Sequence, residues 1–146
     1  MLIAFIALIA CVNTFIGWFG GLFTTHEFNI QMLLGYLFSP FAFLMGIPKE
    51  DILSIGSVLG IKTTLNEFVA YINLAEIAKQ LNPRSVAITT YALCGFANFA
   101  SIAIQIGGIG ALVPTRRKDL AKYGFLAMIG GTLASFLTAA IAGLLI

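Results

Sequence analysis

The residues best suited to bind a ligand are a few polar side chains in two otherwise apolar segments. Glu67 follows Asn66 between two short apolar stretches, and Asn98 and Ser101 lie in the middle of an uncharged segment. A carboxylate accepts hydrogen bonds from vicinal hydroxyl groups, while the Asn amide both donates and accepts. Together these side chains would suit a neutral, polyhydroxylated ligand such as a sugar or a nucleoside.

Each of these residues also has a plainer interpretation. The segment around Glu67 could be a short surface loop in which Lys62 and Glu67 form a solvated pair, although a carboxylate at membrane depth usually marks a ligand path. Asn98 and Ser101 could simply join neighbouring helices by hydrogen bonds. Phe96 could stack on a ligand or only pack against other side chains.

No motif for bond-making chemistry accompanies these residues. The sequence contains no GxGxxG, Walker, HExxH, GxSxG or CxxC motif, which leaves nothing to support nucleotide hydrolysis, metal catalysis or acyl transfer. Cys11 and Cys94 lie in apolar runs and are expected to be buried small hydrophobic residues. We therefore expect neither enzymatic activity nor a bound metal or cofactor.

The elements that position the polar residues must be membrane helices. Of the 146 residues, 60% are hydrophobic and 10% are charged, the net charge is +2 and the mean hydropathy is +1.00. A soluble domain usually has about 25% charged residues. The composition therefore excludes a soluble enzyme domain, a disordered chain and a nucleic-acid-binding module.

Charged residues separate windows that are long enough to cross or nearly cross a bilayer, which takes about 20 apolar residues. We predict an all-α membrane protein with transmembrane helices, a re-entrant helical hairpin and a discontinuous helix. In chain order its segments are a transmembrane helix with a polar junction (1–27), an apolar helix, interrupted near Ser39 and Pro40, that spans the membrane or lies in the interface (28–48), the re-entrant hairpin (49–82), the discontinuous transmembrane helix (83–115), a basic cytoplasmic loop (116–122) and a C-terminal transmembrane helix (123–146).

The hairpin and the broken helix follow from polar residues at mid-membrane. The apolar arms 51–60 and 68–78 are each too short to span, and the polar stretch 61–67 joins them. Such a hairpin is tolerated at membrane depth where protein or a water-filled cavity satisfies its backbone. Asn98 and Ser101, with glycines around them, indicate a helix broken in the same way. The basic cluster 116–122 is expected in the cytoplasm, which places the C-terminus outside.

Five strings of the sequence closely resemble the concentrative nucleoside transporters, in the order found in the C-terminal half of that family. The strings NEFVAY and CGFANF are the most specific of them. The matching stretches are Gly60–Tyr71, Leu81–Ser85, Tyr91–Ile102, Gln105–Gly110 and Arg116–Leu120.

The resemblance implies a homotrimeric, cation-coupled symporter in the plasma membrane or the bacterial inner membrane, with a scaffold domain and a moving transport domain. Residues 1–21 resemble a scaffold helix near the trimer axis. In the family, residues matching Glu67, Asn98 and Ser101 contact the ribose of a nucleoside and the residue matching Phe96 lies near it. We add the neighbouring Asn66 as a further candidate. Ala100 replaces a family serine, so one polar group is lost.

The family's first hairpin, which supplies nucleobase contacts and most sodium ligands, has no counterpart in this sequence. The resemblance therefore implies the C-terminal portion of a transporter, supplying the ribose-binding side, with the missing N-terminal half as a partner. The alternative is a transport-incompetent membrane fragment or accessory subunit that only packs against partner helices. The residues that decide between Na⁺ and H⁺ coupling, and between purine and pyrimidine substrates, lie in the missing half.

Overall fold

The computed structural model describes residues 2–21 and 29–146, and every regular element in these ranges is helical. The prediction of an all-α protein is confirmed for this part of the chain, while the polar residues just before Asn29 lie outside it. The helices are α1 (Leu2–Gly21), α2 (Ile30–Leu44), α3 (Ile52–Thr64), α4 (Glu67–Ile77), η1 (Ala78–Gln80), α5 (Pro83–Leu93), α6 (Phe99–Leu112), η2 (Pro114–Arg116) and α7 (Arg117–Leu145).

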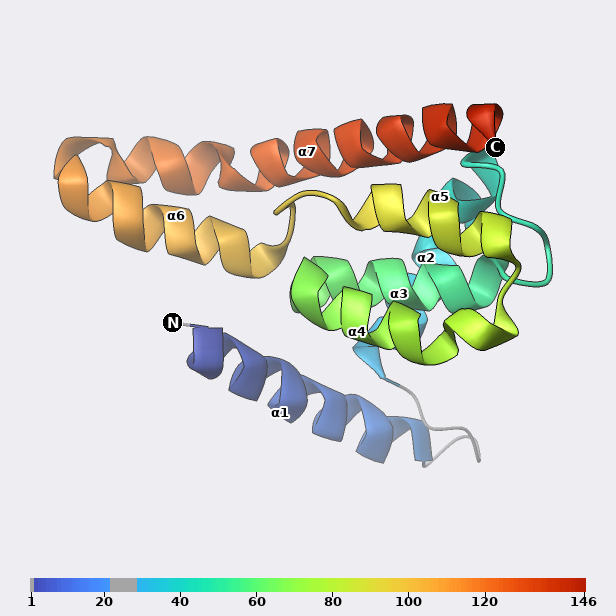
Figure 1. Ribbon diagram of the computed structural model, residues 1–146. Helices are drawn as coiled ribbons and strands as arrows, with labels where there is room; N and C mark the ends of the chain where they lie inside the picture. Colours follow the sequence, from blue (N-terminus) through green and yellow to red (C-terminus); the bar gives the residue numbers. More distant parts are fainter. Residues whose placement is uncertain (1, 22–28) are drawn as a thin grey trace.

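The helices form a layered bundle around two interrupted stretches of chain (Figure 1). α3 and α4 run in opposite directions as a hairpin, and α2 packs along α3. α5 and α6 follow one another in the same direction, and the long helix α7 returns across both of them. α1 lies along one side and touches α2 and α6. This arrangement brings the tip of the hairpin next to the gap between α5 and α6.

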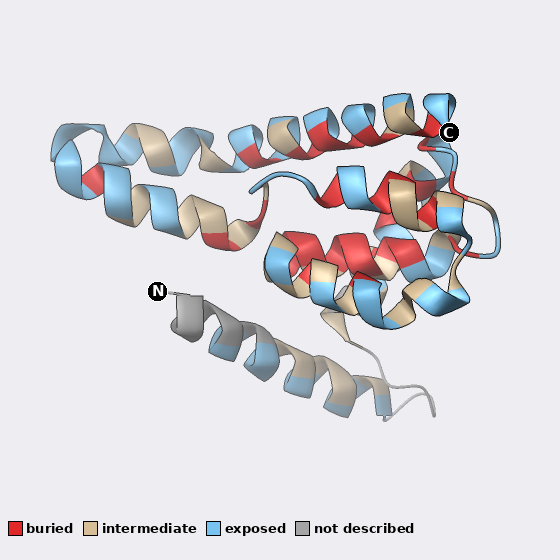
Figure 2. Ribbon diagram, in the orientation of Figure 1, coloured by how far each residue is buried: buried red, intermediate tan, exposed pale blue. Residues whose placement is uncertain are grey.

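The apolar core lies where α2, α3, α5 and α7 meet, shown in red in Figure 2. Ile55, Leu59 and Ile88 are completely buried there. α2 and α3 approach closely because both carry a glycine at the crossing. A Cβ atom on Gly56 would lie 2.4 Å from the carbonyl oxygen of Gly35. Small residues allow helix backbones to come close in membrane proteins.

The expected interruption of the second helix near Ser39 and Pro40 is wrong. α2 is helical without a break from Ile30 to Leu44, with Pro40 in its interior. Pro40 has no amide hydrogen to donate to the carbonyl oxygen of Tyr36, yet the helix continues through it. Proline is more frequent in membrane helices than in soluble ones.

The first arm of the hairpin is longer than its apolar residues indicate. α3 continues to Thr64, so only Leu65 and Asn66 separate it from α4. The reason is that the polar side chains of its last turn are satisfied inside the protein. The hydroxyls of Thr63 and Thr64 donate to the carbonyl oxygens four residues earlier, at 2.9 and 2.7 Å.

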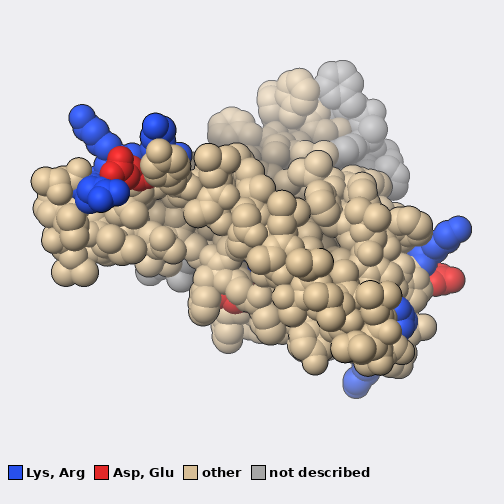
Figure 3. Space-filling view, turned by 90° about the horizontal axis from the view of Figure 1, so that it is seen from above, with Lys and Arg blue, Asp and Glu red and all other residues tan. Residues whose placement is uncertain are grey.

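The last helix begins earlier than predicted. Residues 117–122, expected in a loop, form the first turns of α7, and Arg116 ends the short helix η2. Arg116 also forms an exposed ion pair with Asp119. The stretch Pro114–Leu145 is long and apolar enough to cross a membrane. Figure 3 shows basic side chains at the α6–α7 end and again at the opposite end, with largely uncharged surface between.

Candidate functional site

The candidate site lies where two helices begin next to each other. α4 starts after Asn66 and α6 starts after Asn98, and both asparagines have extended backbone conformations. The Oδ1 atom of Asn66 accepts from the amide of Val69 at 2.9 Å, and that of Asn98 accepts from the amide of Ser101 at 2.8 Å. Asparagine is favoured at this position because it satisfies an amide left free at the helix start.

A side-chain hydrogen bond joins the two helix starts. The Nδ2 atom of Asn98 donates to Oε2 of Glu67 at 2.9 Å, and Ser101 Oγ donates to Asn98 Oδ1, also at 2.9 Å. Glu67 is the first residue of α4, where the helix dipole stabilises a negative charge. Asn98 is 2% exposed, whereas Glu67 and Ser101 are half-buried. Three of the predicted site residues therefore form one connected group.

The other two predicted residues have different surroundings. Asn66 caps α4, and no hydrogen bond joins its side chain to another helix of the described chain. Phe96 is 77% exposed and lies in the non-helical stretch between α5 and α6. The chain turns there at Gly95, whose φ of +135° is a conformation that favours glycine. Phe96 therefore lies at the rim of the site.

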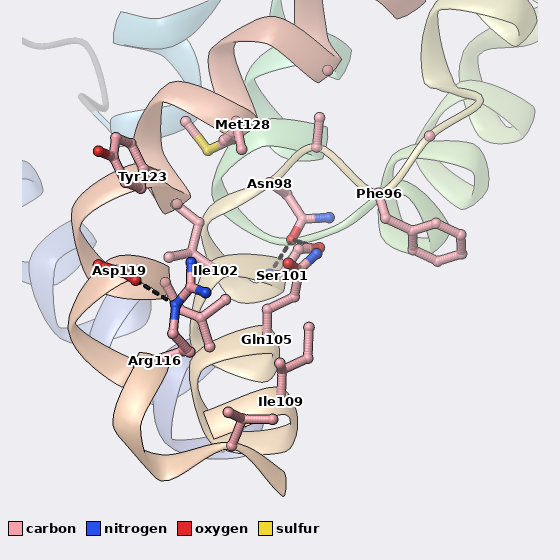
Figure 4. A pocket seen from close by; sticks show the side chains of 17 residues that line it. Phe96, Asn98, Ser101, Ile102, Gln105, Ile109, Arg116, Asp119, Tyr123 and Met128 are labelled. Atoms are coloured by element: carbon pink, nitrogen blue, oxygen red, sulfur yellow. Dashed lines mark hydrogen bonds and ion pairs between the residues drawn. The ribbon is translucent and has the colours of Figure 1, made fainter. Parts of the chain in front are cut away.

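An elongated cleft of about 750 Å³ opens from Asn98 and Ser101 between α6 and α7 (Figure 4). Gln105 lines it on α6, and Tyr123 lines it on α7. Glu67 is not part of the wall and is connected to the cleft through Asn98. In Figure 4 the ion pair of Arg116 and Asp119 lies at one end of the cleft, and the ring of Phe96, at the other end, points away from it.

Gln105 is a residue whose place in this cleft the sequence could have indicated. Asn98, Ser101 and Gln105 follow one another at intervals of three and four residues, which places them on one face of a helix. Tyr123 has no comparable signal, because its position depends on how α7 returns along α6.

Lys62, close to the site in sequence, is buried rather than solvated. Its side chain is 1% exposed, and its Nζ atom donates to the carbonyl oxygen of Ala92 at 2.7 Å. The described residues contain no ion pair between Lys62 and Glu67. The interpretation of this segment as a solvated surface loop is therefore wrong.

The cysteines also differ from expectation, since Cys11 and Cys94 are both exposed. Cys94 follows the last residue of α5 and lies in the non-helical stretch, and its Sγ atom lies 3.1 Å from the Tyr71 hydroxyl. Among the described residues, no three His, Cys, Asp or Glu side chains gather closely enough to hold a metal ion.

Comparisons with known proteins give a consistent result. Residues 1–143 match the family described as "Na+ dependent nucleoside transporter C-terminus". The chain is 49% identical over 146 residues to the uncharacterized transporter YutK of Bacillus subtilis, covering 100% of this chain and 36% of that protein. It is 40% identical over 159 residues to sodium/nucleoside cotransporter 1 of Rattus norvegicus, covering 99% of this chain and 24% of that protein.

Solved structures of CNTnw have the same fold. A CNTnw variant in the intermediate 2 state matches with a TM-score of 0.92 and 44% identity, over 99% of this chain and 37% of that one. CNTnw in an inward-facing substrate-bound state matches with a TM-score of 0.85 and 44% identity, over 98% and 36%. The chain thus spans 24–37% of the length of these relatives.

Proposed function

Because the chain belongs to the family of Na⁺-dependent, concentrative nucleoside transporters, we propose that it is the C-terminal portion of a cation-coupled nucleoside symporter. In this proposal Glu67, Asn98 and Ser101 bind the ribose of the substrate. The supporting observation is the hydrogen bond of 2.9 Å between Asn98 and Glu67, which joins the starts of α4 and α6. The relatives are transporters, and the chain is a transport protein rather than an enzyme.

The free hydrogen-bonding capacity of this group suits a pair of sugar hydroxyls. A carboxylate has about four acceptor positions, and Asn98 occupies one of those on Glu67. The second N–H of the Asn98 amide and the lone pairs of the Ser101 hydroxyl add a donor and an acceptor. A hydrogen bond to a charged group contributes about 1.5–3 kcal/mol. The hydroxyls of ribose therefore have a donor and an acceptor on the protein within one small group.

The interrupted helices suggest how such a site would operate in the membrane. We treat α3 and α4 as the re-entrant hairpin and α5 and α6 as the two halves of a discontinuous helix. The break between α5 and α6 lines the cleft, where water would solvate exposed backbone. The break between α3 and α4 is joined to it through the hydrogen bond from Asn98 to Glu67. Alternating access would expose the site to each side in turn, with Na⁺ or H⁺ as the coupled substrate. Phe96 would enclose the nucleoside from the rim, and Asn66 would support Glu67 by holding the start of α4.

In the proposed transporter, α1 and the basic residues 116–122 would face the lipid or other subunits and the cytoplasm, respectively. The exposed apolar residues of α1, Phe15, Trp18 and Phe19, suit contact with lipid or with other subunits of a homotrimer. The basic residues 116–122 would face the cytoplasm, which puts the C-terminal end of α7 outside. A second portion of the transporter would close the other side of the nucleoside site.

The test is cation-dependent uptake of uridine and adenosine into proteoliposomes. Three proteins are compared: this chain alone, unmodified CNTnw, and a chimera in which this chain replaces the matching segment of CNTnw. The proposal expects uptake by the chimera that depends on a Na⁺ or H⁺ gradient. A correctly inserted chimera without uptake, beside an active CNTnw, would favour the alternative of a membrane fragment or accessory subunit that only packs against partner helices.

A further inference from the structure

The end of α5, next to the candidate site, is held by a buried positive charge. The last carbonyl groups of a helix have no partner within the helix and carry partial negative charge. α5 ends at Leu93, and the Lys62 ammonium group donates to the carbonyl oxygen of Ala92 at 2.7 Å. The ammonium group therefore lies where a cation is favoured.

Uncharged side chains from other helices complete this helix end. The Tyr71 hydroxyl of α4 donates to the carbonyl oxygen of Thr90 at 2.8 Å, and the Ser135 hydroxyl of α7 donates to that of Cys94 at 3.0 Å. The amide of Cys94 itself donates to the carbonyl oxygen of Tyr91 at 3.1 Å. Since neutral groups satisfy the neighbouring carbonyls, the particular contribution of Lys62 is its charge.

Lys62 also links the two segments that carry the site. It lies five residues before Glu67 on the hairpin, and Ala92 lies six residues before Asn98 on the interrupted helix. Two hydrogen bonds therefore join these segments on either side of the site. Lys62 of the hairpin donates to Ala92, and Asn98 of the interrupted helix donates to Glu67. The Glu67 carboxylate is near enough to Lys62 to attract it electrostatically.

A lysine that is almost completely buried is costly unless negative charge compensates it. The carbonyl end of α5 and the Glu67 carboxylate supply negative charge near it. The Glu67 carboxylate can accept hydrogen bonds from two sugar hydroxyls, so the placement of Lys62 between the hairpin and the end of α5 bears directly on the site.

We infer that Lys62 is a positioning residue of the nucleoside site, holding the end of α5 against the hairpin and keeping Glu67 correctly placed for the ribose. The inference rests on the proposed function of the site. Lys62 does not contact the substrate. Its loss acts through Glu67 and Asn98, and so it changes how well the site distinguishes a sugar with two hydroxyls from one without them.

The experiment measures competition by uridine and by 2′,3′-dideoxyuridine for uptake by the CNTnw chimera. The ratio of their half-inhibitory concentrations reports recognition of the ribose hydroxyls independently of the amount of protein. We expect Lys62→Met to reduce the preference for uridine by about tenfold or more, as loss of a charge-assisted contact would. Lys62→Arg retains the charge and is expected to keep the preference. Tyr71→Phe, which removes a neutral contact at the same helix end, serves as the matched control and is also expected to keep it.

The outcomes separate this inference from the proposed function. If the unmodified chimera transports uridine without preferring it to the dideoxy compound, the ribose site itself is refuted. If the preference exists and Lys62→Met retains it, the role of Lys62 is refuted while the site stands. If Lys62→Met does not accumulate in the membrane, Lys62→Gln provides a neutral donor for the same comparison.

A last variant is used if neither Lys62→Met nor Lys62→Gln accumulates in the membrane. Lys62→Met is then combined with Glu67→Gln, which removes the opposite charge. Restored accumulation of the double variant supports compensation between the two charges, and its continued absence refutes it.

Discussion

Replacing Asn98 by Ser or by Ala tests whether one side chain both begins a helix and bridges to the hairpin. Asn98 accepts from the amide of Ser101 at 2.8 Å and donates to Glu67 at 2.9 Å. Serine retains the capping oxygen but is too short to replace the bridge, whereas alanine retains neither function. The two substitutions therefore separate the two contributions.

The magnitudes follow from these contacts. Loss of a helix cap costs about 0.5–2 kcal/mol, and loss of a hydrogen bond to a charged group costs about 1.5–3 kcal/mol. We expect Asn98→Ser to lower the free energy of unfolding by about 1.5–3 kcal/mol. Asn98→Ala should lower it by about 2–5 kcal/mol, the sum of both effects.

Asn66 is the matched control because it caps α4 with the same geometry and, in the described chain, has no hydrogen bond to another helix. Asn66→Ser should leave the free energy of unfolding nearly unchanged, and Asn66→Ala should lower it by about 1 kcal/mol. The assay is unfolding of the purified chain in mixed micelles, with helical content followed by circular dichroism as the fraction of denaturing detergent rises.

Two results would refute this reasoning. If Asn98→Ser is as stable as the unmodified chain, the bond to Glu67 contributes nothing to the fold. If Asn98→Ser and Asn98→Ala are equally unstable, the cap on α6 contributes nothing measurable to the free energy of unfolding. In a double-mutant cycle, Glu67→Gln should reduce the effect of Asn98→Ser, because both substitutions weaken the same contact.

The remaining predictions concern the carboxylate and the closest helix crossing. Glu67→Gln in the CNTnw chimera should weaken uridine binding by about 10- to 150-fold, as loss of a charge-assisted hydrogen bond implies. A uridine dissociation constant that is the same in the variant and in the unmodified chimera would contradict the ribose site. Gly56→Ala should destabilise the chain by about 1–3 kcal/mol in the micelle assay, because the added Cβ atom would lie 2.4 Å from the carbonyl oxygen of Gly35. Gly108→Ala is its control, since apart from neighbouring residues and the backbone of its own helix no atom lies within 4 Å of the added Cβ atom. It should be neutral or stabilising, and equal behaviour of the two variants would contradict the close packing of α2 and α3.

The helices were the most predictable part of the structure, since their positions follow from where charged residues are absent. The ends were less predictable where polar side chains find partners within the fold. α3 continues through Thr63 and Thr64 because their hydroxyls bond to its own backbone. α7 begins at Arg117 because charged residues are compatible with exposed helical turns at the end of a membrane helix.

The site residues were predictable to the extent that their roles are local. The positions of Asn98 and Ser101 at a helix start depend on three consecutive peptide units, so the string around them was informative. The burial of Lys62 depends on Ala92, thirty residues away, and no local pattern indicates it. The exposure of Cys94 likewise depends on the helix ending one residue earlier.

The polar side chains of the site lie at the breaks between helices. In the absence of substrate they form hydrogen bonds with the backbone groups that these breaks leave unpaired. Every interrupted helix leaves amides and carbonyls that need partners at membrane depth. Here Asn98 satisfies the start of α6 while it holds Glu67 on the hairpin, and Lys62 of the hairpin satisfies the end of α5. A ligand bound by Glu67 and Asn98 would therefore contact both interrupted segments at their mutual bridge. In the proposed transporter the hairpin and the broken helix would consequently move together with the nucleoside, since separating them would expose a buried lysine and a helix end.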